Sequence, residues 1–190
     1  MRRILGAART ILKRDGLEAL TTVRIAAEAE IPVGSFYQYF ANKEAVLVAI
    51  YREYLQEMLE MARDADAAAR IHGDWRGYVE AFIRYSRTSE RRDTVIFELF
   101  NAIRTYPELE ELDIAHVRQV VLFVAERLYS LGAHVSRTQL ERLATFLFEV
   151  NNAAWAYQTR VGDACLEEET TDWVIGAMLG VLAPSFESQG

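Results

Sequence analysis

The stretch that decides the fold runs from Thr21 to Glu44 and reads TTVRIAAEAEIPVGSFYQYFANKE. Its spacing of apolar residues predicts two short helices, over 22–29 and 32–39, with a tight turn between them. The two threonines that open the stretch suit the N-cap of the first helix, and Pro32 suits the first turn of the second, where its missing N–H is not needed. Two short helices joined in this way form a candidate helix-turn-helix.

The apolar residues of this stretch indicate which side is buried. We expect Ile25, Ala26 and Ala29 to point inward and Ile31 to plug the turn. A helix this short is not stable alone in water, so it must dock on the helices before and after it.

The opposite side of segment 32–39 would offer side chains that can read DNA. Gln38 could pair with adenine, Ser35 could donate or accept a hydrogen bond, and Val33 could meet a thymine methyl group. The hydroxyls of Tyr37 and Tyr39 could donate to phosphates. The segment would then be a recognition helix in the major groove.

Three further residues fit the same interface. Gly34 removes a side chain where the backbone could approach DNA, Lys43 could neutralise a phosphate, and the Thr22 hydroxyl could bond another. The alternative is that 34–40 is an aromatic core segment of an ordinary helical protein, which composition alone favours.

The charge is unevenly distributed along the chain. The 190 residues carry a net charge of −7, but residues 1–52, the head, hold eight basic and five acidic residues, a net of +3. Residues 53–190, the body, therefore carry −10. A basic head on an acidic body is typical of nucleic-acid contact through the head.

The head resembles the DNA-binding domain of the TetR/AcrR family of repressors over about residues 4–50. The resemblance rests on IAAEA at 25–29, GSFYQYF at 34–40 and the lysine of the following NKE. It implies a homodimer of all-α subunits that binds a palindromic operator and is released by a small molecule. Six residues match the DNA-contact positions of the family: Thr22, Val33, Ser35, Tyr37, Tyr39 and Lys43.

The chain departs from the family at the turn, where Glu30 stands in place of the usual glycine. A left-handed backbone there would cost a residue with a side chain about 1 kcal/mol, and an acidic group near DNA would weaken binding. The basic arm before the first helix is also short, with only Arg2 and Arg3.

The whole chain reads as all-α, because Pro and Gly are sparse and no run alternates with period 2. We expect an N-terminal helix-turn-helix domain over 1–50 and a larger helical ligand-binding and dimerisation domain over 51–190. About nine helices are predicted: 2–15, 22–29, 32–39, 43 to the low sixties, 75–89, 94–105, 107–132 with a possible break near 112–113, 137–161 and 167–183.

The larger domain is long enough to hold an apolar pocket between its helices. Six residues are candidates for lining it: Phe97, Asn101, Arg104, Phe123, Asn151 and Trp155. The effector would be apolar or amphipathic, and an inward Arg104 would suit an anionic one. The alternative is that the asparagines are partly exposed or lie at an interface.

The last two helices are the candidate dimer interface. Gly176 and Gly180 stand one turn apart, so a partner helix could approach closely. The alternative is that these glycines serve packing within one subunit.

Other function classes find little support. The single cysteine, Cys165, excludes a disulfide framework or a cysteine-rich zinc site, and no catalytic, metal or cofactor motif occurs. With neither a signal peptide nor a long apolar run, we expect a cytoplasmic protein without a membrane span. The remaining alternative is an all-α enzyme or small-molecule-binding module with a coincidental helix-turn-helix.

Overall fold

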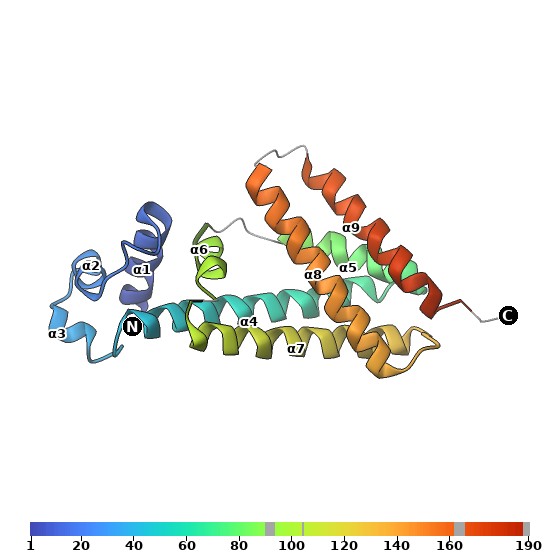
Figure 1. The fold of residues 1–190 in the computed structure, drawn as a ribbon, viewed down its shortest axis with the longest axis horizontal. Coiled ribbons are helices and arrows are strands. Elements are labelled where there is room, and N and C mark those ends of the chain that lie inside the picture. Colours follow the sequence, from blue (N-terminus) through green and yellow to red (C-terminus); the bar gives the residue numbers. More distant parts are fainter. Residues whose placement is uncertain (90–93, 104, 162–165, 188–190) are drawn as a thin grey trace. The chain divides into compact units, whose positions relative to one another are not determined.

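The structure is a computed structural model that describes residues 1–89, 94–103, 105–161 and 166–187 (Figure 1). Its described part is built of helices without any strand, which confirms the predicted all-α fold. The helices are α1 (Arg2–Asp15), α2 (Thr22–Glu28), α3 (Val33–Phe36), α4 (Lys43–Ala69), α5 (Trp75–Ser89), α6 (Thr94–Ile103), α7 (Pro107–Ser130), α8 (Arg137–Val161), α9 (Leu166–Leu182) and the short 3-10 helix η1 (Ala183–Ser185).

Local signals in the sequence set several of these boundaries. Four helices begin after a side chain whose oxygen accepts a backbone N–H of the first turn, which satisfies a donor that the helix leaves open. These caps are Thr21 to Arg24 N at 3.2 Å, Asn42 to Ala45 N at 2.8 Å, Asp74 to Gly77 N at 2.9 Å and Ser136 to Gln139 N at 3.2 Å.

Several helix ends differ from the prediction by one or two residues, and three helices differ in a way that matters for the fold. α3 ends at Phe36 and residues 37–39 form a turn, because the Tyr39 N–H bonds the Phe36 carbonyl three residues back at 3.0 Å. α4 continues to Ala69, since its alanines at 65 and 69 pack inward. α7 shows no break at 112–113 and runs continuously over Pro107–Ser130.

The chain divides into two compact units. The first comprises Met1–Met58 and Arg91–Ala115, and the second Leu59–Glu90 and His116–Gly190. The first unit thus contains a later segment besides the helix-turn-helix. The boundary at residue 50 stays a prediction.

The core of the first unit joins the head to α6. Ile4, Ile11 and Leu12 of α1 lie in one buried cluster with Val95 and Leu99 of α6. A hydrogen bond supports this packing, because the Leu17 N–H, in the loop after α1, donates to Glu98 Oε2 at 3.3 Å. A segment some eighty residues later in the chain therefore completes the core beneath the helix-turn-helix.

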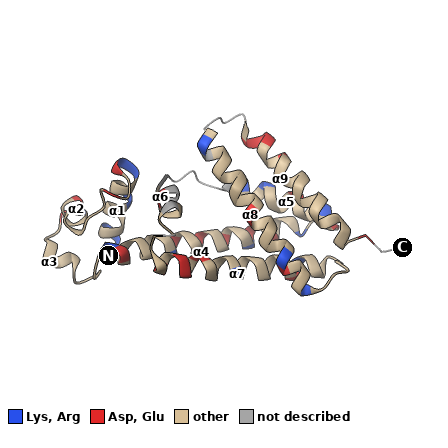
Figure 2. Cartoon of the chain, viewed as in Figure 1, with Lys and Arg blue, Asp and Glu red and all other residues tan. Residues whose placement is uncertain are grey.

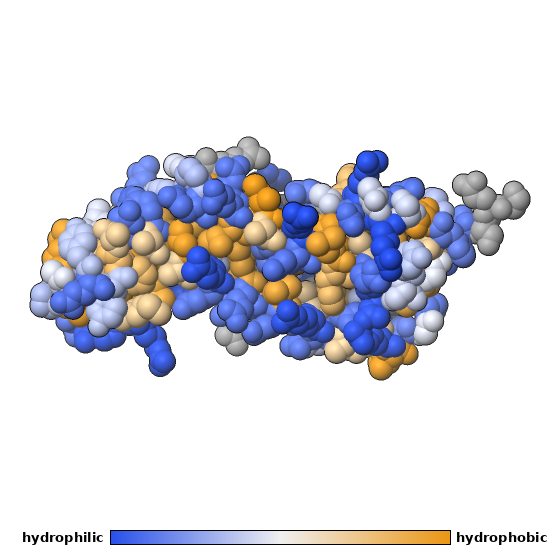
Figure 3. Space-filling view, turned by 90° about the horizontal axis from the view of Figure 1, so that it is seen from below, coloured by the Kyte–Doolittle hydropathy of each residue, from blue (hydrophilic) through white to orange (hydrophobic). Residues whose placement is uncertain are grey.

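The second unit combines an apolar core with a buried ion-pair cluster. Its core includes Leu128, Leu140 and Leu182, from α7, α8 and α9. The carboxylate of Asp66, 3% exposed, accepts from Arg127 Nε and Nη2 at 2.7 and 3.0 Å and from the Tyr78 hydroxyl at 2.8 Å. On the face drawn in Figure 3, apolar residues reach the surface in several places among hydrophilic ones.

Candidate nucleic-acid interface

The helix-turn-helix is held together by the residues that the sequence predicts to point inward. Ile25 and Ala26 are fully buried and Ala29 is 4% exposed. Ile31 packs against the same cluster, and its N–H donates to the Ala26 carbonyl at 3.0 Å, which closes the turn. Because the small Ala26 faces the core, α2 can pack closely on α1.

The turn contains the strain that the sequence predicts. Glu30 has φ 51° and is the one residue other than glycine with a positive φ among the described residues. Its side chain is exposed, and Arg3 Nη2 lies 3.4 Å from its Oε2. Since both side chains are largely in solvent, this ion pair contributes little to stability.

The side of segment 32–39 expected to face DNA is exposed. Val33, Tyr37 and Tyr39 are 39%, 54% and 56% exposed. Gly34 and Gln38 are exposed as well. Such exposure of large apolar and aromatic side chains is unusual for a core segment, so the aromatic-core alternative does not describe this face.

The same segment is anchored by its two phenylalanines. Phe36 is fully buried, Phe40 is 8% exposed, and their ring centroids lie 6.1 Å apart. Ser35 is half-buried, so its exposure is intermediate between that of the buried phenylalanines and that of the exposed residues. α3 therefore has one side fixed in the core and one side open, although it is shorter than predicted.

Two candidate DNA contacts from different helices lie side by side. The Thr22 Oγ1 atom is 3.3 Å from the Tyr37 hydroxyl, within hydrogen-bond distance. Thr22 opens α2 and Tyr37 follows α3, so the contact joins the two helices at the open face. Lys43 is half-buried at the first position of α4.

One exposed residue of this region escaped the sequence analysis. Val23, the second residue of α2, is 60% exposed beside Thr22. The exposure of an apolar side chain next to the candidate contacts identifies Val23 in the structure. The sequence pattern alone does not separate Val23 from the core residues of the helix.

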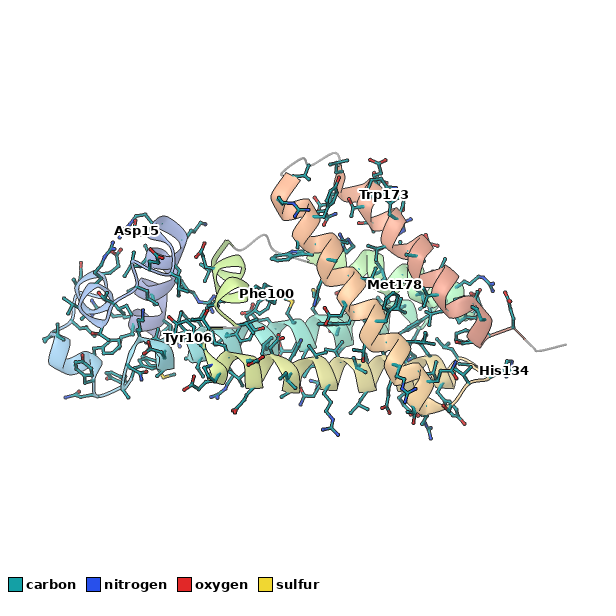
Figure 4. All side chains as sticks on the ribbon, in the orientation of Figure 1. Asp15, Phe100, Tyr106, His134, Trp173 and Met178 are labelled. Atoms are coloured by element: carbon teal, nitrogen blue, oxygen red, sulfur yellow. The ribbon has the colours of Figure 1, made fainter. Side chains whose placement is uncertain are left out.

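Most arginines of the head are engaged with carboxylates. Arg14 bonds Asp15 and Glu28, each at 3.2 Å, Arg24 also bonds Asp15, at the end of α1 (Figure 4), and Arg9 bonds Glu53 at 3.1 Å. Burial raises the pKa of the Asp15 carboxyl, but the hydrogen bonds from Arg14 and Arg24 outweigh it and lower that pKa.

The basic excess of the head therefore lies elsewhere. Within the described residues, the basic side chains of the head that make no ion pair are Arg2, Lys13, Lys43 and Arg52. α3 itself carries no charge (Figure 2). The open face of the helix-turn-helix thus offers hydroxyls, an amide and apolar groups, and Lys43 is the basic residue without an ion pair that follows α3 most closely in the sequence.

The six candidate pocket residues are described unequally. Arg104 and the side chains of Phe97 and Asn101 lie outside the described part. Phe123 on α7 is half-buried, as are Asn151 and Trp155 on α8. The structure brings Asn151 together with Arg87 of α5, a residue that the sequence analysis did not single out.

Arg87 is a buried cation at a junction of three helices. It is 4% exposed and donates from Nε to Thr171 Oγ1 at 3.0 Å, from Nη1 to Asn151 Oδ1 at 3.1 Å and from Nη2 to Gln158 Oε1 at 2.6 Å. The sequence gives no signal for this residue, because burial of an arginine depends on acceptors that lie some sixty to eighty residues later.

α8 and α9 pack side by side (Figure 1), and α9 keeps one face open. Met178 is 6% exposed, whereas Trp173 is 53% exposed (Figure 4). A Cβ added at Gly176 or Gly180 would meet nothing within 4 Å. These glycines therefore do not serve close packing within the described part of the chain. On α8, by contrast, Leu140 and Leu147 belong to the core of their own unit.

The chain was compared with known proteins. Residues 4–50 match the family model of bacterial regulatory proteins, tetR family. A search of curated proteins gave no match. None of the described helices combines the length and apolar character needed to cross a membrane.

Solved structures resemble the chain along nearly its whole length. A transcriptional regulator from Rhodococcus sp. Rha1 is 16% identical, with a TM-score of 0.75 over 94% of this chain and 95% of that one. A TetR-family transcriptional regulator from Streptomyces coelicolor is 20% identical, with a TM-score of 0.73 over 98% and 95%. The multidrug binding protein EbrR, in complexes with imidazole and with ethidium, is 20% identical with TM-scores of 0.70, over 93% of this chain and 93% and 96% of EbrR. At these identities the likeness shows the fold.

Proposed function

We propose that this chain, whose residues 4–50 are a DNA-binding domain of the TetR family and whose fold is that of TetR-family regulators, is a dimeric repressor released from a palindromic operator by a small molecule. The observation that carries the DNA-binding part is the open face of the helix-turn-helix. There, Thr22 and Tyr37 meet at 3.3 Å, and Val33 and Tyr39 are exposed beside a buried anchor.

The proposed DNA contacts divide by chemistry. Val33, Ser35 and Gln38 read base edges in the major groove, and Gly34 lets the backbone approach. The hydroxyls of Thr22, Tyr37 and Tyr39 and the ammonium of Lys43 bind phosphates. Since Thr22 and Tyr37 already lie within hydrogen-bond distance, they form one preorganised hydroxyl pair for the backbone of the operator.

We place the dimer interface on α8 and α9. The support is the open face of α9, where the exposed Trp173 stands one turn before Gly176, and Gly176 one turn before Gly180. A partner helix could approach the backbone at the two glycines and cover the indole. A two-fold dimer then presents two helix-turn-helix motifs to two half-sites at least about 34 Å apart.

The effector binds in the larger helical domain. EbrR, which has the same fold, binds imidazole and ethidium. An effector that binds more tightly to a dimer conformation whose half-site spacing does not match the operator shifts the dimer toward that conformation and lowers its operator affinity. The loss of affinity is limited by the difference in the effector's binding free energy between the two conformations.

The test of DNA binding is a gel shift with the DNA immediately upstream of the gene, at low salt. The wild-type chain should retard this DNA. Tyr37→Ala should reduce the operator affinity at least about tenfold, because it removes a charge-assisted contact to a phosphate and the hydroxyl that lies against Thr22. Tyr129→Ala is the matched control, because Tyr129 is 43% exposed but lies on α7. The proposal is rejected if neither the wild type nor the Tyr129→Ala control retards this DNA at micromolar protein.

A further inference from the structure

The exposed apolar side chains of the first unit are concentrated on the helix-turn-helix. Among its described residues, six large apolar or aromatic side chains are exposed, and four of them lie between residues 23 and 39. Three of these four, Val33, Tyr37 and Tyr39, belong to the proposed DNA contacts. The fourth is Val23, which is the most open of the four at 60% exposed, and the proposed contacts do not include it.

The surroundings of α2 leave Val23 on an uncharged side of the helix. The first side of α2 is buried in the core, as described above. Arg24 and Glu28, one turn apart, form a second side, and both make ion pairs with the end of α1. Val23 and Ala27, also one turn apart and both exposed, form a third side. Because Ala27 is small, no long side chain of α2 stands beside Val23 on this side.

The uncharged side of α2 begins next to the proposed DNA contacts. Val23 follows Thr22, whose Oγ1 atom is 3.3 Å from the Tyr37 hydroxyl. Tyr37 stands four residues after Val33, at the end of α3. The contact between Thr22 and Tyr37 therefore brings the start of α2, with Val23, to the open face of α3, with Val33.

The chemistry of Val23 matches one feature of a base pair. An uncharged, branched side chain offers nothing to a phosphate. In the major groove, the one methyl group that the base pairs present is the C5-methyl group of thymine. Contact between this group and Val23 removes apolar surface of both from water, whereas cytosine carries only a hydrogen at C5 and leaves a gap.

We propose that Val23 is a specificity-determining residue, which contacts the methyl group of a thymine in each operator half-site. The inference rests on the proposed function, because it takes the open face of the helix-turn-helix to lie against DNA. It goes further by assigning a base contact to α2 as well as α3, and by naming the base and the atoms that this residue reads.

The test compares two forms of the DNA immediately upstream of the gene in gel shifts with the full chain. One form contains thymine, and the other contains uracil at every thymine position, which keeps the base pairing and removes only the methyl groups. The wild type should bind the thymine DNA more tightly. Val23→Ala should bind the thymine DNA at least about fourfold more weakly than the wild type, the factor for burial of one methyl group, and should bind the uracil DNA equally well.

Two controls separate a lost contact from a general defect. Ile71→Ala removes an apolar side chain that is 82% exposed in the turn after α4, and it should keep the wild-type difference between the two DNAs. Val23→Ala should unfold at the same urea concentration as the wild type, because an exposed side chain contributes little to packing. Single uracil substitutions should then identify a thymine to which the wild type is sensitive and Val23→Ala is not.

The inference is overturned if Val23→Ala weakens binding to both DNAs equally, or if it leaves the affinity for the thymine DNA unchanged. In both cases the wild type still retards the DNA, so the proposed repressor function stands. A wild-type chain that retards neither DNA rejects the proposed function and this inference with it.

Discussion

Replacement of Glu30 by glycine should make the chain more stable. Glu30 has φ 51°, a left-handed conformation that costs an L-residue with a side chain about 1–2 kcal/mol. Glycine removes this cost. Glycine also loses more backbone freedom on folding, which destabilises the folded state by about 0.5–1 kcal/mol. The Arg3–Glu30 ion pair, with side chains 65% and 85% exposed, adds almost nothing to either side. The difference spans about 0–1.5 kcal/mol, and we expect a net gain near its centre, about 0.5–1 kcal/mol.

The measurement is urea unfolding at pH 7, supported by thermal melts, in which this gain corresponds to a rise in Tm of roughly 1–4 °C for a chain of this size. Two reference variants separate strain from charge. Glu30→Ala removes the carboxylate but keeps a Cβ, and Glu30→Gln removes the charge but keeps the shape. Both should stay within about 0.5 kcal/mol of the wild type, the range of ordinary surface substitutions.

The explanation by strain fails if Glu30→Ala stabilises as much as Glu30→Gly, because the alanine variant retains the left-handed cost. It fails also if Glu30→Gly is no more stable than the wild type. Operator affinity should rank the variants differently from stability. Both Glu30→Gln and Glu30→Gly remove an acidic group from the turn and release Arg3 from its ion pair. Both should bind DNA more tightly, by a few-fold at low salt, and the gain should shrink as salt rises.

Three further predictions concern the two units and the dimer. Asp66→Asn should cost about 3–5 kcal/mol in chemical unfolding, because it leaves the partly buried charge of Arg127 without its carboxylate. Burial raises the pKa of Asp66, but the hydrogen bonds from Arg127, Tyr78 and Arg70 outweigh burial and lower that pKa. The wild type should therefore lose stability as the pH falls below 3.8, the value of the carboxyl in the unfolded chain. Asp66→Asn has no carboxyl at this position and should lack this loss. Tyr51→Phe should cost about 1.5–3 kcal/mol, since the fully buried Tyr51 donates its hydroxyl to Asp113 at 2.6 Å, and an unchanged urea midpoint would contradict this. Gly180→Leu should leave helicity by circular dichroism unchanged, because a Cβ there meets nothing within 4 Å, yet convert dimer to monomer in sedimentation; a persistent dimer would move the interface away from this face.

The sequence predicts well where local chemistry decides the structure. Helix starts follow from capping side chains such as Asn42 and Asp74, and the inward face of α2 follows from the spacing of Ile25, Ala26 and Ala29. Both features involve residues within a few positions of one another, so a single sequence contains the information. The strain at the turn was instead indicated by the resemblance to the TetR/AcrR family, which usually has glycine where this chain has Glu30.

Prediction is weaker where distant segments meet. The bond from the Leu17 N–H to Glu98 and the burial of Leu99 in the first unit join segments some eighty residues apart, and no periodicity announces them. Arg87 was missed for the same reason. The end of α3 at Phe36 is not explained by the burial of Phe36 and Phe40 either, because residues four apart would share one face of a continuous helix.

The charge of the head illustrates how composition and structure differ. A net of +3 indicates a basic DNA-binding surface, yet Arg9, Arg14 and Arg24 are bound to carboxylates of the same unit. A phosphate that approaches one of these arginines must compete with that carboxylate, and releases fewer counterions than one that meets a free cation. The affinity of the proposed interface must therefore come in larger part from the hydroxyls around Tyr37 and from base contacts. Because hydroxyl and base contacts depend little on salt, the same distribution of charge favours discrimination between operator and random DNA over tight nonspecific binding.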